Sequence, residues 1–161
     1  MNATNLQQYI TQNQIDAEIL FLEVETPTVE AAALALGVLP EQIIKSVLFL
    51  ADKEPVLVIA SGLARLNYKL LADYLGMSRR RVKIAGPDEV LVITGYVAGS
   101  VPPFGHVQPI RTVVETAVLS LPHPHIYGGG GDINALMKLT AAELQRVVGG
   151  EVAQLAVSRE Q

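Results

Sequence analysis

Five short, dense runs of apolar residues most constrain what this chain can fold into. They are Ile19–Leu22, Val47–Leu50, Val56–Ile59, Val90–Ile93 and Val152–Val157. Three of the runs do not alternate cleanly between apolar and polar residues. Continuous runs rich in β-branched residues are typical of strands that are covered on both faces. We therefore expect a sheet that is buried between other elements.

Helix signals fall between these runs. Thr26-Pro27-Thr28 followed by Gly37 places proline near a helix start and glycine just past its end, which is the expected asymmetry. The intervening segment is mostly Ala and Leu, which predicts a buried helix. Thr140 and Glu143 predict a capping box. The predicted helices are Asn5–Asn13, Val29–Leu36, Asn67–Leu75, Pro87–Ile93 and Thr140–Val148.

Val90–Ile93 fits a strand as well as a helix, and the preceding Pro87-Asp88-Glu89 favours the helix because it is a strong N-terminal signal. Ala51–Pro55 predicts a hairpin turn between two strands. Strands are expected near residues 18–23, 44–51, 55–60, 80–84, 108–111, 113–119, 125–127 and 152–157. This order predicts an α/β fold with a mixed sheet and not a repeating series of strand–helix–strand units.

Length and composition bound the class of protein. The chain has 161 residues, about one domain, so we expect a single domain over residues 1–161. Hydrophobic residues make up 50% and charged residues 17%, which excludes a disordered chain. No apolar run approaches the roughly 18 residues of a membrane span, and the first residues lack the basic region of a signal peptide. We expect no membrane partner and a cytoplasmic protein.

Cysteine and charge exclude further classes. The chain contains no Cys, which excludes disulfides, a cysteine nucleophile and an iron–sulfur cluster. The net charge of −4 argues against broad nucleic-acid binding, because phosphate contacts need a basic surface. DNA binding is therefore not expected. Arg79-Arg80-Arg81 with Lys83 is the one basic cluster, and Arg65 and Lys69 are candidates to lie near it. It is either a solvated turn or a phosphate-contacting edge.

Several sequence patterns exclude common kinds of site. Gly128–Gly131 is not followed by the Lys-Ser/Thr of a phosphate-binding loop, so it marks either a turn or a backbone that approaches a ligand closely. His106, His123 and His125 lack a further donor at metal-ligand spacing, so we interpret them as loop histidines and expect no metal and no cofactor. No Gly-x-Ser-x-Gly motif is present, so a serine triad is not expected.

Two features remain as candidates for chemistry. Lys45 enters an otherwise apolar strand, where its side chain either reaches out to solvent or projects into a pocket. A lysine in a pocket can bind a phosphate or polarise a carbonyl. Gly95–Gly105 contains three glycines and two prolines, which pre-shape a loop. Such a loop can hold backbone groups toward a substrate and stabilise an oxyanion. Gly95–Pro109 and Pro122–Asn134 are the two irregular stretches of the chain, and both are rich in Gly and Pro. Long loops of this kind often carry function.

The chain resembles the YbaK / prolyl-tRNA-synthetase-associated editing domain family from about Thr26 to Val157. Each motif alone is weak, and the resemblance depends on their occurring together and in order. The motifs are Thr26-Pro-Thr-Val-Glu-Ala-Ala, Ile44-Lys-Ser-Val-Leu-Phe, Leu66-Asn-Tyr-Lys-Leu, Ala85-Gly-Pro-Asp-Glu-Val, Thr94-Gly-Tyr, Gly99-x-x-x-Pro103-Phe-Gly105, Tyr127-Gly-Gly-Gly and Leu139-Thr-Ala-Ala-Glu-Leu.

The resemblance implies a bent, barrel-like mixed sheet surrounded by helices. It also implies trans-acting hydrolysis of the ester of a mischarged aminoacyl-tRNA, most often Cys- or Ala-tRNA-Pro, without metal or cofactor. The nucleophile would be water or, in the Cys-specific branch, the substrate's own thiol. The implied partners are mischarged tRNA and, as a further candidate, an aminoacyl-tRNA synthetase. The alternative is a non-catalytic binding or regulatory module that retains the pocket.

The resemblance also implies roles for particular residues. Lys45 matches the essential lysine, which holds the 3′-terminal phosphate or the substrate near the ester, and Gly99 and Ser100 open the loop that faces the ester. We expect these three to be catalytic. The expected substrate-binding residues are Thr26, Ser46, Arg65, Val101, Pro103, Gly128, Gly129 and Gly130.

This chain departs from the family's pattern at the positions that select the amino acid. Ser100 replaces a second glycine that many relatives carry, and its hydroxyl would narrow the pocket or donate a hydrogen bond. Asp132 and Asn134 follow the glycine run where the Ala-editing branch has His. Leu136 stands near the position of an acidic residue found in some Cys-specific members.

Overall fold

A long β-hairpin organises the molecule. The structure is a computed structural model that describes residues 1–157. β2 (Ile44–Ala51) pairs antiparallel with β3 (Glu54–Ser61) along its whole length, in the register Ile44↔Ser61 to Ala51↔Glu54. Asp52 and Lys53 form the two-residue turn with φ of 50° and 72°. Two positive φ values are typical of the type I′ turn, whose twist matches that of the strands. The predicted turn is therefore confirmed.

The hairpin lies in a five-stranded sheet of order β5-β2-β3-β6-β9. β5 (Val82–Ile84) pairs antiparallel with the distal end of β2, and β6 (Arg111–Glu115) runs parallel to β3. The short β9 (Val152–Ala153) runs parallel to β6. The sheet is therefore mixed, as predicted.

Two smaller sheets complete the strands of residues 1–157. One has the order β1-β8-β7 and is antiparallel throughout, with β1 (Glu18–Phe21), β7 (Ile126–Gly129) and β8 (Ala135–Leu139). The other pairs β4 (Arg65–Leu66) with β10 (Ala156–Val157). The mixed α/β class is confirmed. In residues 1–157 the strands form three separate sheets and no closed barrel.

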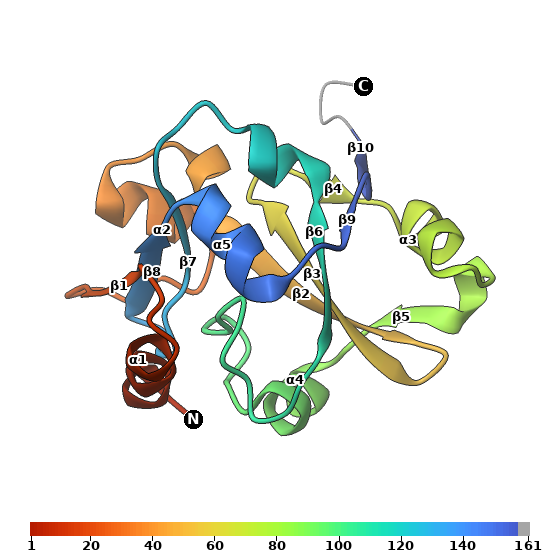
Figure 1. Ribbon diagram of the computed structural model, residues 1–161, viewed down its shortest axis with the longest axis horizontal. Coiled ribbons are helices and arrows are strands. Elements are labelled where there is room, and N and C mark those ends of the chain that lie inside the picture. Colours follow the sequence, from red (N-terminus) through yellow and green to blue (C-terminus); the bar gives the residue numbers. More distant parts are fainter. Residues whose placement is uncertain (158–161) are drawn as a thin grey trace.

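Among residues 1–157, five α-helices surround the sheets (Figure 1). α1 lies beside the three-stranded sheet, whereas α3 lies at the opposite end of the molecule, near β5. None of the helices within residues 1–157 is long and apolar enough to cross a membrane. The helices are α1 (Ala3–Gln12), α2 (Val29–Leu36), α3 (Tyr68–Leu75), α4 (Pro87–Thr94) and α5 (Ala141–Val148), with 3₁₀ turns η1 (Pro40–Gln42), η2 (Arg79–Arg81) and η3 (Thr116–Ser120).

The helix ends follow from local sequence. The side chains of Thr28, Asn67 and Thr140 each accept a backbone N–H in the first turn of the helix that follows. Gly37 and Gly76 end their helices with φ of 69° and 74°, which favours glycine. All five predicted helices are confirmed within two residues at each end, including the ambiguous segment around Val90.

Five expectations are wrong in detail. Residues 108–110 lie outside any strand, and the strand expected over 113–119 ends at Glu115 and continues as η3. The strand expected over 152–157 divides into β9 and β10, which join different sheets. The predicted burial of α2 holds for Ala32 and Ala33, whereas Leu34 is 86% exposed. The capping box is half formed, because Glu143 binds Arg146 and the Asp16 N–H instead of the cap.

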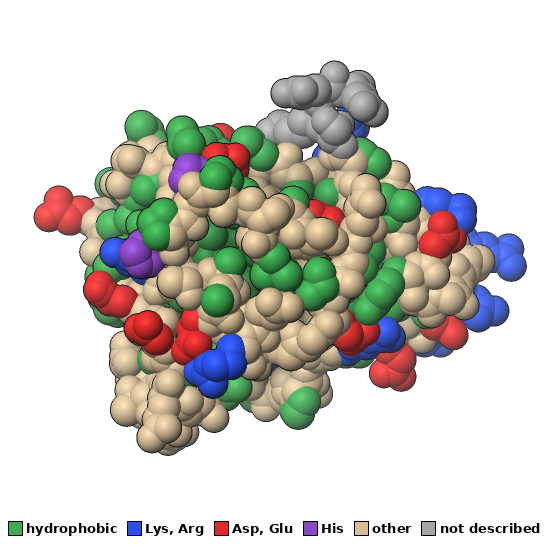
Figure 2. Space-filling view, turned by 45° about the horizontal axis from the view of Figure 1, so that its top comes forward, with side chains coloured by type: hydrophobic (Ala, Val, Ile, Leu, Met, Phe, Trp, Pro, Cys, Tyr) green, Lys and Arg blue, Asp and Glu red, His purple; other side chains and the backbone are tan. Residues whose placement is uncertain are grey.

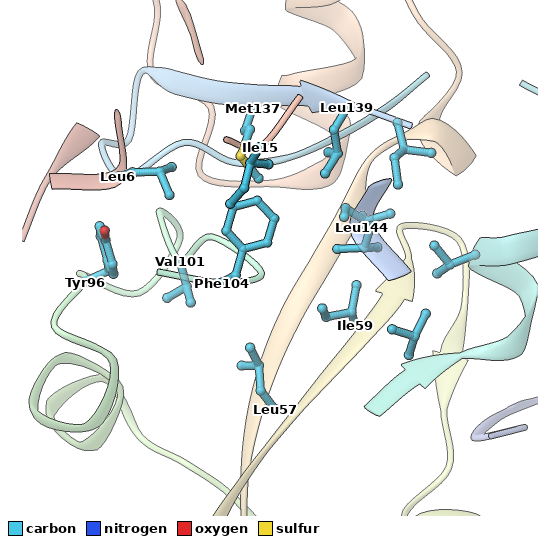
Figure 3. Packing of buried hydrophobic residues seen from close by; sticks show 14 of the residues in the cluster. Leu6, Ile15, Leu57, Ile59, Tyr96, Val101, Phe104, Met137, Leu139 and Leu144 are labelled. Atoms are coloured by element: carbon cyan, nitrogen blue, oxygen red, sulfur yellow. The ribbon is translucent and has the colours of Figure 1, made fainter. Parts of the chain in front are cut away.

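The main core lies between the five-stranded sheet and the three-stranded sheet (Figure 3). Leu57 and Ile59 of β3 face Phe104, Met137 and Leu144 there, and Leu57 is fully buried. A second cluster fills the other face of β2 and β3 against α3. The hairpin is therefore covered on both faces, as its continuous apolar runs predict.

The position of the core predicts that truncating two leucines, one buried and one exposed, has very different effects on the free energy of unfolding. Leu57→Ala should lower the free energy of unfolding by about 2–5 kcal/mol, since it removes buried methyl groups and leaves a cavity. Leu34→Ala, on the exposed face of α2, should change it by less than about 0.5 kcal/mol. Urea denaturation measures both. Equal losses would contradict the assigned core.

Glu143 makes contacts whose contribution to stability depends on pH. Hydrogen bonds from Arg146 and from the Asp16 N–H lower its pKa from 4.5 to about 2. A carboxylate with a lowered pKa in the folded state stabilises that state above its unfolded pKa, and the stabilisation is lost as the pH falls through the folded pKa. Wild type should therefore be more stable than Glu143→Gln at pH 7, and the difference should shrink between pH 4.5 and about 2. Thermal melts over this pH range would contradict the proposed contribution of Glu143 if the difference in Tm between wild type and variant stayed constant.

Candidate functional site

A cavity of about 220 Å³ lies along the edge of β2. β5 pairs only with Phe49–Ala51, and one more backbone hydrogen bond, from Ala85 N–H to Leu48 O, follows on that side before Ile43 bridges to Tyr127 of β7. Residues 43–48 of β2 therefore border the cavity with an edge that β5 leaves uncovered. β7, the Gly95–Gly105 loop and the start of α2 close the other sides. The lining residues are Thr26–Val29, Ala32, Ile43–Leu48, Ile84, Ala85, Val90, Ala98, Gly99, Val101, Gly128, Gly129 and Leu136.

Lys45 lies at the border between this cavity and a second one. Its Nζ donates a hydrogen bond to Ala64 O at 2.7 Å, in the turn that follows β3. The side chain is half-buried and lines both spaces. The second cavity, of about 440 Å³, is also lined by Arg65 and Glu30. The lysine thus projects into a pocket region, which was one of the two alternatives left open by its position in the sequence.

The Gly95–Gly105 loop is held in shape from within. Tyr96 is fully buried and its hydroxyl donates to Gly105 O at 3.2 Å, and burial raises the pKa of Tyr96 to about 12. The Ser100 hydroxyl donates to Val97 O at 2.7 Å, and its N–H donates to the same oxygen at 3.0 Å. Gly99 has a φ of 91°, a conformation that favours glycine.

This loop leaves two backbone donors beside the cavity. Ala98 and Gly99 are exposed and line it. Within residues 1–157, neither of their N–H groups donates to another protein group. Adjacent N–H groups on a rigid loop can bind a carbonyl oxygen that is gaining negative charge.

The glycine run packs against backbone at Gly129, Gly130 and Gly131. A Cβ on Gly129 would lie 2.2 Å from Val101 O, and one on Gly130 would lie 2.6 Å from the backbone of Ala135. Gly131 packs against the start of α1, and its N–H donates to Ser100 O at 3.0 Å. Only glycine permits these approaches. The run therefore joins the two loops around the cavity, and Gly128 and Gly129 reach its wall.

Asp132 is a structural contact that sequence reasoning did not assign. Its Oδ2 accepts the N–H of Ala3 at 3.1 Å, at the N-terminus of α1. α1 also reaches the other loop, because Tyr9 stacks on Phe104 with ring centroids 5.9 Å apart. The helix thereby supports both loops from behind. An aspartate can be recognised in the sequence as a helix cap only when it lies next to the helix start. Asp132 and Ala3 are 129 residues apart, so the sequence carries no such signal.

The structure brings most of the expected site residues to one cavity. Its lining includes Lys45, Ser46, Thr26, Gly99, Val101, Gly128 and Gly129. Ser100, Pro103 and Gly130 lie directly behind the lining: Ser100 is 2% exposed and its hydroxyl serves the loop itself. Arg65 lies on the second cavity.

Apolar residues that sequence reasoning did not single out form much of the wall. Ala32, Ile43, Val90 and Leu136 come from four different elements. Each belongs to an ordinary apolar pattern, so no local signal distinguishes a cavity wall from a core position. None of the described residues that line this cavity is Asp or Glu.

The histidines have separate partners. His106 Nε2–H donates to Pro102 O at 2.8 Å, and burial lowers the pKa of His106 below its usual 6.5, so the ring is neutral at pH 7. His123 Nε2 lies 2.6 Å from Glu41 Oε1. Across residues 1–157, no three His, Asp or Glu side chains are grouped so that they could hold a metal ion.

A cavity that offers backbone amides and one ammonium group suits a small, carbonyl-bearing group better than a large cofactor. The chain belongs to the aminoacyl-tRNA editing domain family, which matches residues 23–147. The family resemblance read from the sequence motifs is thereby confirmed.

Known proteins similar to this chain include free-standing and fused examples. The uncharacterized protein YwhH of Bacillus subtilis is 28% identical over 145 residues, which cover 89% of each chain. The proline–tRNA ligase of Streptococcus pyogenes is 34% identical over 122 residues, and the match spans 74% of this chain but 19% of the ligase. A solved structure described as that of a candidate trans-editing enzyme for prolyl-tRNA synthetase superposes with a TM-score of 0.88 at 30% identity, covering 97% of each chain.

The close packing of Gly129 against the Val101 carbonyl predicts an effect of substitution on stability. Gly129→Ala should destabilise the protein by about 1–3 kcal/mol, since its Cβ forces β7 away from the Val101 carbonyl. Gly150→Ala is the matched control, because a Cβ there meets nothing within 4 Å. Denaturant unfolding of both variants checks the prediction. Equal stability of the two variants would contradict the close packing of Gly129 against Val101.

Proposed function

We propose that this protein is a trans-acting deacylase that hydrolyses the ester of a mischarged aminoacyl-tRNA, with Cys- or Ala-tRNA-Pro as the expected class. The observation that carries the proposal is the pair of Ala98 and Gly99 amides beside a cavity that Lys45 borders. Membership of the editing-domain family supports the same reaction.

In the proposed reaction a water molecule attacks the carbonyl carbon of the aminoacyl ester. The Ala98 and Gly99 N–H groups stabilise the oxyanion of the tetrahedral intermediate. The bond between that carbon and the ribose 3′-oxygen then breaks, and the oxygen leaves as the tRNA hydroxyl after taking a proton from solvent. The products are the free amino acid and uncharged tRNA. An aminoacyl ester is already activated, so a nucleophilic side chain is not needed.

Lys45 would separate the two parts of the substrate. Its ammonium group borders the smaller cavity, in which we place the aminoacyl group, and would bind the phosphate of the 3′-terminal adenosine at the mouth of that cavity. Arg65 lines the second cavity that Lys45 borders and would add positive charge on that side of Lys45. Ser46 and Thr26 line the smaller cavity and would contact the amino acid.

The polarity of the smaller cavity favours an uncharged amino acid. Ala32, Val90 and Leu136 give this cavity of about 220 Å³ an apolar wall. A cationic side chain would lose hydration without meeting a carboxylate in the described wall, which is unfavourable.

Deacylation of a panel of Cys-, Ala-, Ser- and Thr-charged tRNAs tests the proposal. We expect hydrolysis of one or two members, with Cys- or Ala-tRNA-Pro among them, and a loss of at least about 100-fold in kcat/KM for Lys45→Ala, which removes a charged contact to the substrate. Lys138→Ala, on β8 away from the cavity, is the control and should retain activity. Spontaneous rates on every member, for wild type and variant alike, would favour the alternative of a non-catalytic binding module.

A further inference from the structure

Charge is segregated along this chain. Residues 45–83 contain eight of the twelve Lys and Arg residues, whereas residues 1–44 contain none and carry six Asp or Glu. The overall charge of −4 therefore conceals a basic part and an acidic part. Figure 2 shows Lys and Arg side chains gathered at one end of the molecule, the end at which α3 and β5 lie in Figure 1.

Four of these cations form what we call the basic edge: Arg79, Arg80, Arg81 and Lys83, from η2 and β5. All four are exposed. Two have side-chain partners, since the Arg79 guanidinium lies 4.2 Å from the centroid of the Tyr68 ring and Arg81 Nη1 lies 3.7 Å from Asp52 Oδ2. Among the described residues, Arg80 and Lys83 take part in no ion pair. These two charges are therefore available to a ligand without the loss of a folding contact.

The basic edge leads directly into the cavity. Ile84 and Ala85, the next residues after Lys83, line the cavity wall. Thr26–Val29 also line the cavity, and Glu23, Glu25 and Glu30, which lie close by in the chain, are exposed. A polyanion whose end enters the cavity is thus attracted by the basic edge and repelled by these carboxylates.

We propose that the basic edge receives the phosphates of a tRNA acceptor stem while the 3′ end enters the cavity. The inference rests on the proposed function and adds to it the surface and the direction of approach. The stem lies over β5 and η2, away from the acidic start of α2. A few phosphate contacts at the edge of an acidic protein give weak binding that falls steeply with salt.

Binding of uncharged tRNA at low salt tests the surface without depending on catalysis. Arg80→Glu combined with Lys83→Glu should raise the Kd by about tenfold or more and flatten its dependence on salt concentration. Lys138→Glu, on the three-stranded sheet, is the control and should leave the Kd within about twofold of wild type. Thermal melts verify that every variant is folded.

The outcomes separate this proposal from the proposed function. An unchanged Kd in the double variant, an equal loss in the control, or no binding of tRNA by wild type would each overturn the basic edge as the docking surface. Equally tight binding of a DNA duplex of the same length would overturn its assignment to tRNA. Salt-sensitive binding that the double variant loses, in a wild-type protein that deacylates no charged tRNA, would support the surface and contradict the deacylase.

Discussion

The close approach of the glycine run to the Gly95–Gly105 loop is the contact on which the site depends. Gly129 lies against the Val101 carbonyl, and the Gly131 N–H donates to Ser100 O. These contacts bring the three-stranded sheet against the edge of β2 and leave between them the cavity of about 220 Å³. Side chains at these glycines would separate the two loops.

The proposed site offers backbone amides where many hydrolases use side chains. Its donors are amides on a loop that Tyr96 and the Ser100 hydroxyl hold rigid, so their positions are set by folding and not by the substrate. Preorganised donors need little rearrangement when charge develops, which is the physical basis of oxyanion stabilisation. Lys45 adds one positive charge at the rim. The sequence predicts a catalytic role for Ser100. In the structure its hydroxyl instead bonds to Val97 O and holds the loop, behind the residues that line the cavity.

Whether an element could be predicted from the sequence depends on how local its physical signal is. The caps at Thr28, Asn67 and Thr140 and the turn at Asp52-Lys53 are set by neighbours within a few residues, and the helices and the central hairpin follow from them. β8 escaped prediction because Ala-Leu-Met-Lys-Leu has little preference for a strand, and it becomes one by pairing with β1 and β7 on its two sides. The division of residues 152–157 likewise depends on β6 and β4, which are distant in sequence.

The sequence by itself determined the mixed α/β class, the positions of the helices, the family and the candidates Lys45, Gly99 and Gly128–Gly129, because periodicity, caps and ordered motifs are properties of the chain alone. Only the tertiary structure decided which candidates share a wall: it placed Arg65 on a second cavity, Ser100 behind the loop and Leu136 inside the pocket. It also joined Asp132 to α1 and brought the basic edge beside the cavity. These are contacts between segments far apart in sequence, and packing alone fixes their distances.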